Sequence, residues 1–289
     1  MPPVLLRRVV AQCRVVVDND FAGDPDGILA LAHHLLSPSN RVVAITSSFL
    51  NPRFVVPPAT PGATAEDGTR LAVALLDELG LADPPPVSTG AEEPFTSGSG
   101  SAAAEAIVAA AREESDLPLF VVCAGPLTNV AAALELDPGI AGRMTLVWIG
   151  GSLDPDAFEY NRDTDAFAAE SVFAVPGLEI HQFPLETYRR CAYSVAELEA
   201  DLPATGRLGA WLFGCFSSPP DWVQLGGVWP IGDSPPLLIT ALTTDSSTRS
   251  APCDGVTVYT DVDMRLLVGD LLAKLRLHER RASVARRGP

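Results

Sequence analysis

Positive charge is scarce in this chain of 289 residues. Lys and Arg together number 20 against 36 Asp and Glu, His occurs four times, and the formal net charge is −16. Nucleic acids and anionic membrane surfaces are bound through positively charged protein surfaces. The composition therefore argues against both as partners.

Cysteine is also sparse, and long apolar runs are absent. The five cysteines contain no C-x-x-C pair, which argues against structural zinc and thioredoxin-type chemistry. Their odd number and wide spacing favour reduced thiols. No run of about 18 apolar residues predicts a membrane span, and the first residues lack a signal-peptide pattern. We expect a cytoplasmic protein.

Hydrophobic residues make up 47% of the chain and charged residues 19%. Many of the hydrophobic residues lie in short apolar segments. This composition excludes an intrinsically disordered chain. Apolar runs that predict strands alternate with segments of helical periodicity. The strands are expected at 15–17, 42–46, 119–123 and 144–149, and helices at 28–36, 71–79, 102–112 and 268–277. The alternation predicts one α/β domain over residues 1–289, an open, mostly parallel sheet with helices on both faces. Loops are expected at 51–67, 82–101 and 217–236.

Four aspartates directly follow the first predicted strand. They are Asp18, Asp20, Asp24 and Asp26, within nine residues. Ligands of open α/β sheets bind outside the carboxyl ends of the strands. Carboxylates this close repel one another unless some are protonated or a cation lies among them, and an all-oxygen set selects calcium or magnesium. The alternative is a solvated acidic turn in which Asp24 caps the next helix.

Three further segments occur in a fixed order with this loop, and together they resemble the inosine-uridine-preferring nucleoside hydrolases. The chain reads Asp18-Asn19-Asp20, then Gly125-Pro126-Leu127-Thr128-Asn129, then Gly150-Gly151 followed by Glu159-Tyr160-Asn161. The resemblance runs from about Val15 to Asp270. It implies a Rossmann-like nucleoside hydrolase fold, a bound calcium ion, and hydrolysis of the N-glycosidic bond of ribonucleosides in purine or pyrimidine salvage. It also implies a homodimer or homotetramer.

The same resemblance assigns roles to individual residues. Calcium would be held by the carboxylates of Asp20, Asp26 and Asp233 and by the main-chain carbonyl of Ala124. Asp20 would also take a proton from the attacking water. The ribose hydroxyls would be bound by Asp24, Asn51, Glu159 and Asn161. The alternatives are a turn residue for Asn51 and Asp233, each next to or near a proline, and a surface loop for Glu159 and Asn161.

Two segments depart from the family pattern. Gly232 replaces the histidine that precedes the calcium aspartate, and residues 97–101 read Ser-Gly-Ser-Gly-Ser where a His-Gly-x-Asp-Gly segment is expected. Protonation of the leaving group contributes about 10²–10⁴-fold to such reactions. None of His33, His34, His181 and His278 is a clear substitute acid. Asp221 or Glu92 could supply one from a loop, and Trp222 or Trp229 could stack on a base or simply be buried.

Three functions are therefore compared. The first is a calcium-dependent ribonucleoside hydrolase, and the second is a non-catalytic calcium-dependent ribose- or nucleoside-binding protein. The third, a magnesium phosphatase with Asp18 or Asp20 as nucleophile, leaves the Gly-Pro-Leu-Thr-Asn and Glu-x-Asn segments unexplained. The hydrolase accounts for the most segments.

Overall fold

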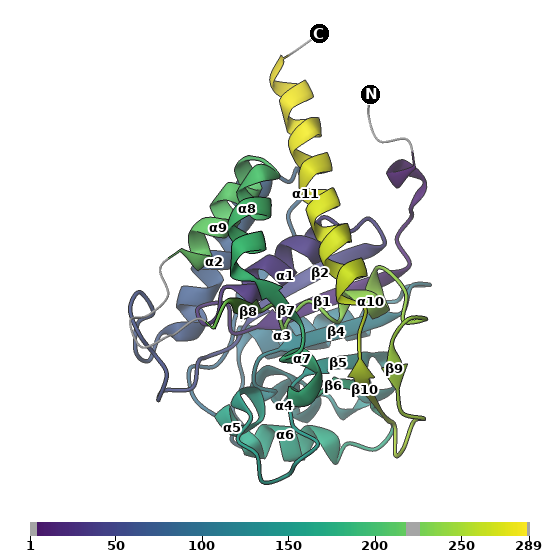
Figure 1. Cartoon of the computed structure of the whole chain (residues 1–289). Helices are drawn as coiled ribbons and strands as arrows, with labels where there is room; N and C mark the ends of the chain where they lie inside the picture. The colour runs from purple at the N-terminus through teal and green to yellow at the C-terminus, as the bar shows by residue number, and fades with distance from the viewer. Residues whose placement is uncertain (1–4, 218–225, 288–289) are drawn as a thin grey trace.

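An eight-stranded sheet forms the centre of the molecule (Figure 1). Its computed structural model describes residues 5–217 and 226–287. The strand order is β3-β2-β1-β4-β5-β6-β10-β9, and all neighbours pair in parallel except β9 and β10. The strands are β1 (Cys13–Asn19), β2 (Asn40–Ser47), β3 (Val87–Thr89), β4 (Leu119–Ala124), β5 (Thr145–Ile149), β6 (Glu179–Phe183), β9 (Thr248–Arg249) and β10 (Val256–Asp261). The open, mostly parallel α/β sheet predicted from the sequence is confirmed.

Strand β1 lies in the interior of this sheet because both of its faces are apolar. Val15 and Val17 belong to one hydrophobic core, and Val16 belongs to the other. Successive residues of a strand point to opposite faces, so an uninterrupted β-branched run suits a strand covered by helices on both sides.

Helices cover both faces of the sheet (Figure 1). One face carries α1 (Asp26–Leu35), α2 (Thr64–Leu79), α8 (Val195–Ala204), α9 (Arg207–Phe216) and α11 (Met264–Arg287). The other carries α3 (Ala102–Arg112), α4 (Thr128–Leu136) and α6 (Ala166–Phe173). Shorter elements are η1 (Leu6–Arg8), η2 (Pro138–Arg143), α5 (Tyr160–Thr164), α7 (Leu185–Tyr188), α10 (Leu237–Thr240), and the antiparallel pair β7 (Ala192–Ser194) and β8 (Val228–Pro230). No helix in the described ranges is long and apolar enough to cross a membrane.

The predicted limits of two helices were wrong. Helix α2 begins at Thr64, inside the predicted loop 51–67, because its first turns pack closely on the end of β2. A Cβ atom at Gly68 would lie 2.3 Å from Ser47 Oγ, so glycine permits this approach. Helix α11 starts four residues earlier and ends ten residues later than the predicted 268–277.

The strand order reverses between β1 and β4. Strands β2 and β3 follow on one side of β1, whereas β4, β5 and β6 follow on the other. The chain leaves β1 toward α1 on one face and leaves β4 toward α4 on the opposite face. Such a reversal opens a crevice at the carboxyl ends of the two strands. The acidic loop after β1 borders this crevice.

Candidate active site

The three carboxylates that the resemblance assigns to the metal lie close together at the crevice. Asp20 follows β1, Asp26 begins α1, and Asp233 lies in the turn after β8. The Asp233 N–H donates to Asp26 Oδ2 over 3.2 Å, and Asn19 Nδ2 donates to Asp233 Oδ2 over 2.9 Å. Two local elements and a turn more than 200 positions away in the sequence thus share one site.

The electrostatics of these carboxylates reflect their mutual proximity. Asp20 and Asp26 are 8% and 6% exposed, and burial followed by the charge of Asp233 raises the pKa of each well above its ordinary value. The pKa of Asp233 is raised to about 7, chiefly by desolvation. Asp24 lies on the solvent side, and its charge also raises the pKa values of Asp20 and Asp26. The site is therefore rich in repelling negative charge.

Asp18, the first of the four clustered aspartates, has a different environment. Its Oδ1 accepts hydrogen bonds from Thr46 Oγ1 at 2.6 Å and Asn129 Nδ2 at 2.8 Å. Asp18 is fully buried and connects β1 to β2 and to the start of α4. Its carboxylate holds the walls of the crevice together.

Ala124 ends β4 next to Asp20. It pairs with Asn19 in the register of β1 and β4. A Cβ atom at the following Gly125 would lie 2.6 Å from Ser48 Oγ and 3.1 Å from the Asp20 nitrogen. The absence of a side chain at position 125 lets the loop after β4 approach the acidic loop.

Asn51 and the Glu159–Asn161 segment lie after β2 and β5, at the same edge of the sheet. The Asn51 N–H donates to Tyr160 Oη over 3.3 Å, which joins the two segments directly. Asn51 Oδ1 accepts from the Arg53 N–H at 3.1 Å and closes a turn. Asn161 Nδ2 donates to the carbonyl oxygen of Ile149 at 2.8 Å, at the end of β5.

Glu159 is fully buried, and its carboxylate is surrounded by donors. It accepts from the N–H groups of Gly151 at 2.6 Å, Arg162 at 2.8 Å and Asn161 at 3.1 Å. Tyr188 Oη donates to Glu159 Oε1 over 2.7 Å. Glu159 thus caps α5 and fastens it to the loop after β5.

Comparison with known proteins identifies this arrangement. The family model described as inosine-uridine preferring nucleoside hydrolase matches residues 15–258. The chain belongs to this family of ribosyl hydrolases. The pyrimidine-specific ribonucleoside hydrolase RihA of Salmonella paratyphi A is 29% identical, over 65% of this chain and 69% of the relative.

Solved structures of nucleoside hydrolases share the fold. An inosine-guanosine nucleoside hydrolase superposes with a TM-score of 0.70 at 17% identity, covering 93% of this chain and 99% of the other. The purine-preferring ribonucleoside hydrolase of Gardnerella vaginalis gives a TM-score of 0.67 at 20% identity, with 92% and 99% covered. The resemblance and the fold class inferred from the sequence are both confirmed.

Tyr188, which no sequence motif points to, fills the space beside Gly232 in this nucleoside hydrolase. A Cβ atom at Gly232 would lie 3.1 Å from Tyr188 Cδ2 and 3.6 Å from Asp26 Oδ2. Tyr188 ends the short helix α7, and its hydroxyl is directed to Glu159. A side chain larger than glycine at position 232 would displace this ring.

The other candidates for a substitute acid lie elsewhere or serve other contacts. Glu92 accepts from the Ala65 and Glu66 N–H groups at 3.0 and 2.9 Å, at the start of α2. His33 and His34 are buried at the opposite end of α1 from Asp26. His278 belongs to α11, and Asp221 and Trp222 lie outside the described residues.

Trp229 is buried and contacts the acidic loop through its nitrogen. Its Nε1 donates to Asp24 Oδ1 over 2.8 Å, and its ring meets that of Phe216 edge-on at 5.3 Å between centroids. Trp229 therefore positions Asp24 from the core side.

The donor set of the crevice fits a hard cation in its chemistry, because carboxylate and carbonyl oxygens are what such ions bind. In residues 5–217 and 226–287, however, no three His, Cys, Asp or Glu side chains are already arranged to hold a metal ion. The Asp20, Asp26 and Asp233 side chains would have to close on an ion to ligate it together.

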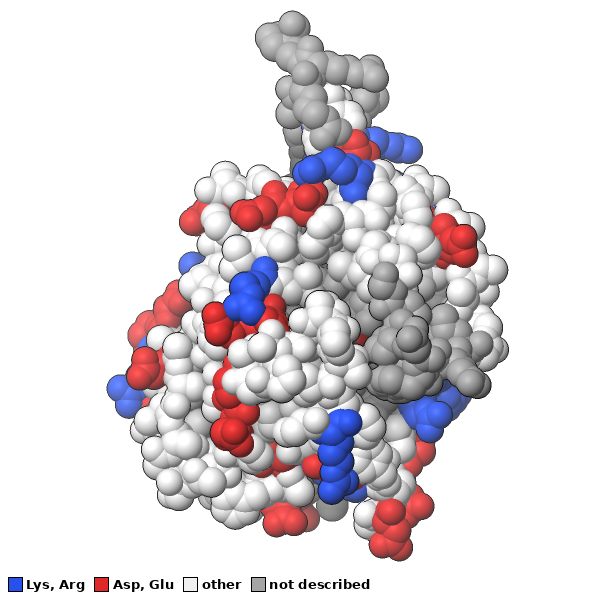
Figure 2. Space-filling model, turned by 90° about the vertical axis from the view of Figure 1, so that its left-hand side faces the viewer, with Lys and Arg blue, Asp and Glu red and all other residues white. Residues whose placement is uncertain are grey.

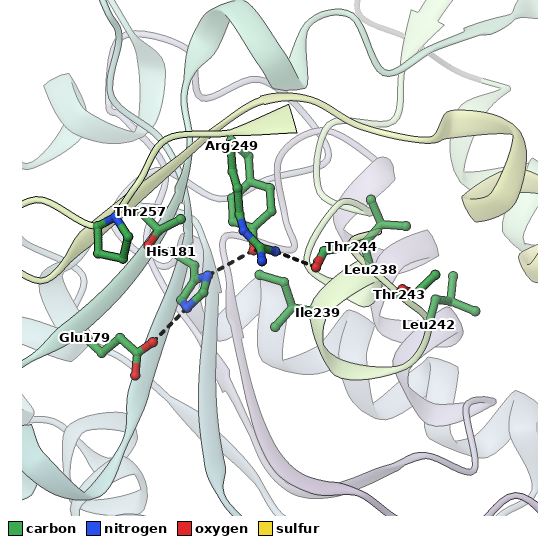
Figure 3. A pocket seen from close by; sticks show the side chains of 11 residues that line it. Glu179, His181, Leu238, Ile239, Leu242, Thr243, Thr244, Arg249 and Thr257 are labelled. Carbon is green, nitrogen blue, oxygen red and sulfur yellow. Dashed lines mark hydrogen bonds and ion pairs between the residues drawn. The ribbon is translucent and has the colours of Figure 1, made fainter. Parts of the chain in front are cut away.

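A separate hollow of about 450 Å³ lies against β6, β9 and β10 (Figure 3). His181 lies 3.1 Å from both Tyr259 Oη and Glu179 Oε1, and Arg249 Nη1 donates to Thr244 Oγ1 over 2.6 Å. None of the crevice carboxylates lines it. His181 therefore makes its contacts with residues that line this hollow.

Proposed function

We propose that this nucleoside hydrolase cleaves the N-glycosidic bond of ribonucleosides in a calcium-dependent reaction. The observation that supports this most directly is the meeting of Asp20, Asp26 and Asp233 at the β1/β4 crevice, where burial and mutual repulsion raise their pKa values. A divalent cation would offset that repulsion. Purine or pyrimidine salvage in the cytoplasm, by a single-domain homodimer or homotetramer, completes the proposal.

Asp20, Asp26, Asp233 and the Ala124 carbonyl would hold the calcium ion. When bound, the ion supplies a position and a lowered pKa for the attacking water. Calcium accepts irregular sets of six to eight oxygens, which suits side chains that must close on it. Asp24, Asn51, Glu159 and Asn161 would orient the ribose, with Glu159 acting through the contacts that fix Asn161.

The surrounding residues favour a positively charged sugar in the transition state. As the C1′–N bond breaks, its electron pair leaves with the base and positive charge develops on the ribose. A negative crevice stabilises that charge more than the neutral substrate. Asp20 takes a proton from the water whose oxygen forms the new bond to C1′, and the departing base takes its proton from solvent.

Substitution of Asp20 by Asn tests the proposal. The change keeps the shape of the side chain and removes the base, so we expect release of ribose from inosine, uridine and p-nitrophenyl riboside to fall at least about 100-fold. The exposed Asp156 is the matched control, and Asp156→Asn should retain wild-type activity.

Two outcomes would contradict the proposal. Unchanged turnover and unchanged calcium binding in Asp20→Asn would remove Asp20 from the site. Wild-type protein that binds nucleosides in calcium but releases no ribose, even from p-nitrophenyl riboside, would favour the non-catalytic binding protein.

A further inference from the structure

The hollow against β6, β9 and β10 has one wall made by the sheet itself (Figure 3). The register pairs Thr257 of β10 with His181 of β6. Glu179 precedes His181 by two positions and Tyr259 follows Thr257 by two, so all four side chains lie on one face of the sheet. This polar wall bounds a volume of about 450 Å³, which is within the range of pockets that hold small molecules.

The wall on the other side of the hollow is apolar. It comes from α10 and the segment that follows it, with Leu238, Ile239 and Leu242 (Figure 3). A polar wall facing an apolar one is typical of sites in which a few polar groups fix the orientation of a small molecule.

Arg249 supplies positive charge to this hollow. Its guanidinium carbon lies 5.8 Å from the centre of the Tyr259 ring, and Nη1 donates to Thr244 Oγ1 over 2.6 Å. These contacts hold the side chain in place, whereas Nε and Nη2 have no acceptor among the described residues. No carboxylate of the described residues forms an ion pair with Arg249. A planar guanidinium with free N–H groups is suited to two oxygens of a phosphate or carboxylate.

Thr257 contributes a hydroxyl group that the protein does not use. The residue is 5% exposed and lines the hollow, and its hydroxyl has no hydrogen-bond partner among the described residues. A nearly buried hydroxyl without a partner is costly, and such groups are usually satisfied by protein or by a bound molecule. The Thr257 hydroxyl is therefore available to a ligand in the hollow.

Glu179 lies at the other end of a chain of polar contacts from Arg249. His181 stands between Glu179 Oε1 and Tyr259 Oη, at 3.1 Å from each, and the Tyr259 hydroxyl lies 3.5 Å from Arg249 Nη1. The carboxylate and the guanidinium are thus separated by two side chains. A ligand that spans the hollow would meet a cation at one end and a hydrogen-bond acceptor at the other.

We propose that this hollow binds a small polyhydroxylated anion. Its phosphate or carboxylate group binds Arg249, and its hydroxyl groups bind Thr257 and Glu179. The site goes beyond the proposed hydrolysis and does not depend on it, because none of the crevice carboxylates lines the hollow.

Calorimetric titration of the full chain with glucose 6-phosphate and with gluconate tests the proposal. Neither probe carries a ribose, which the crevice is proposed to bind. Glucose, which has no anionic group, and inorganic phosphate, which has no hydroxylated body, are the reference compounds. The variants are Arg249→Gln and Thr257→Val. Arg41→Gln is the matched control, since Arg41 is an exposed arginine of β2 outside the hollow.

We expect at least one probe to bind, and the one that binds identifies the anionic group. Arg249→Gln should weaken its binding at least about tenfold, the effect of losing a hydrogen bond to a charged group. Thr257→Val should weaken it about threefold to tenfold without lowering the free energy of unfolding, because the hydroxyl has no protein partner to lose. Glucose and inorganic phosphate should bind more weakly than the probe, and Arg41→Gln should match the wild type.

Several results would overturn the proposal. These are the absence of binding of both probes at millimolar concentration, unchanged affinity in Arg249→Gln, and an equal loss of affinity in Arg41→Gln. Inorganic phosphate that binds as tightly as glucose 6-phosphate would overturn it too, since the hydroxylated body would then make no contact. Should Arg249→Gln fail to fold, Thr257→Val and the reference compounds decide the question.

Discussion

Asp18 and Asp20 are separated by one residue, yet their carboxylates have different surroundings. Asp18 receives hydrogen bonds from Thr46 and Asn129, whereas burial and the charges of Asp233 and Asp24 raise the pKa of Asp20. Asp18 lies within β1, whereas Asp20 follows the end of the strand, where the regular alternation of side chains no longer applies. One carboxylate therefore fixes the neighbouring elements, and the other is available for chemistry.

Tyr188 provides a prediction at this scale. Tyr188→Phe removes the donor to Glu159 Oε1, while three N–H donors remain on this fully buried carboxylate. We expect the free energy of unfolding to fall by about 1–3 kcal/mol, the cost of an unmade buried hydrogen bond. Urea unfolding of the wild type and the variant measures it.

Tyr193→Phe is the control for this comparison. Tyr193 Oη donates over 3.0 Å to Asp201, a carboxylate that is partly open to solvent. Water can replace that donor, so the loss should be smaller. If Tyr188→Phe and Tyr193→Phe lowered the free energy of unfolding equally, the burial of Glu159 would add nothing to the strength of its hydrogen bond with Tyr188.

The residues of the site differ in how far the sequence could predict them. Asp20 and Asp26 follow from local spacing after a buried strand, and Asp233 from its place in an ordered set of motifs. Tyr188 and the Trp229–Asp24 hydrogen bond depend on contacts between distant segments. Contacts of this kind cannot be predicted from the spacing of residues in the sequence.

Helix α1 is the element that joins the crevice to the far side of the molecule. Its first residue is Asp26, and its last turns bury His33 and His34. His33 Nε2 lies 2.7 Å from Asp270 Oδ2, and Lys274 of α11 contacts both Asp270 and Ser37. The C-terminal helix therefore fixes the helix that carries a crevice carboxylate.

The buried side chain of His34, on α1, predicts that the free energy of unfolding depends on pH. Burial, followed by the charges of His33 and Lys274, lowers the pKa of His34 from 6.5 to about 3. The folded pKa lies below the unfolded one, so the contribution of neutral His34 is complete above pH 6.5 and is lost as pH falls toward 3. The loss is about 1.4 kcal/mol per pH unit for one proton.

His34→Asn isolates that contribution. Asparagine offers Oδ1 where His34 Nδ1 meets Asn40 Nδ2 at 2.9 Å, and it does not titrate. Unfolding free energies at pH 7.5, 6 and 5 should fall less steeply for the variant than for the wild type. The same pH dependence of the unfolding free energy in wild type and variant would show that His34 has the same pKa in the folded and unfolded protein.

At the level of elements, the sequence predicted strands better than helix ends. β1, β2, β4 and β5 are continuous apolar runs that must be buried on both sides, so their positions follow from composition. The start of α2 depends on the close packing of Gly68 against Ser47, and α8 and α9 lie where no helix was predicted. Their limits are set by tertiary packing.

Across the whole molecule, the excess of negative charge divides into two populations. Acidic side chains are dispersed over the face shown in Figure 2, where solvent screens them. The crevice carboxylates are instead buried or next to one another. Only the repulsion among the crevice carboxylates lowers the stability of the fold substantially. A bound cation can reduce that repulsion.

Calcium should therefore stabilise the whole fold. At about 1,000 times its dissociation constant, a ligand of the folded state alone adds about 4 kcal/mol. We expect calcium to raise the thermal midpoint more than magnesium does, and a chelator to reverse the effect. Calorimetry or thermal denaturation followed by circular dichroism measures the shift.

Asp26→Asn provides the decisive comparison. The variant should lose the calcium-induced shift, and in chelator it should be at least as stable as the wild type because one repelling charge is gone. The same calcium shift in wild type and variant would place the ion elsewhere in the protein.

The distance in sequence between the acidic loop and Asp233 has a consequence for synthesis of the protein. A nascent chain that ends before position 233 already carries Asp20 and Asp26 but lacks their partner. The crevice is completed only after four fifths of the chain has left the ribosome. Chains truncated before position 233 therefore lack a complete crevice.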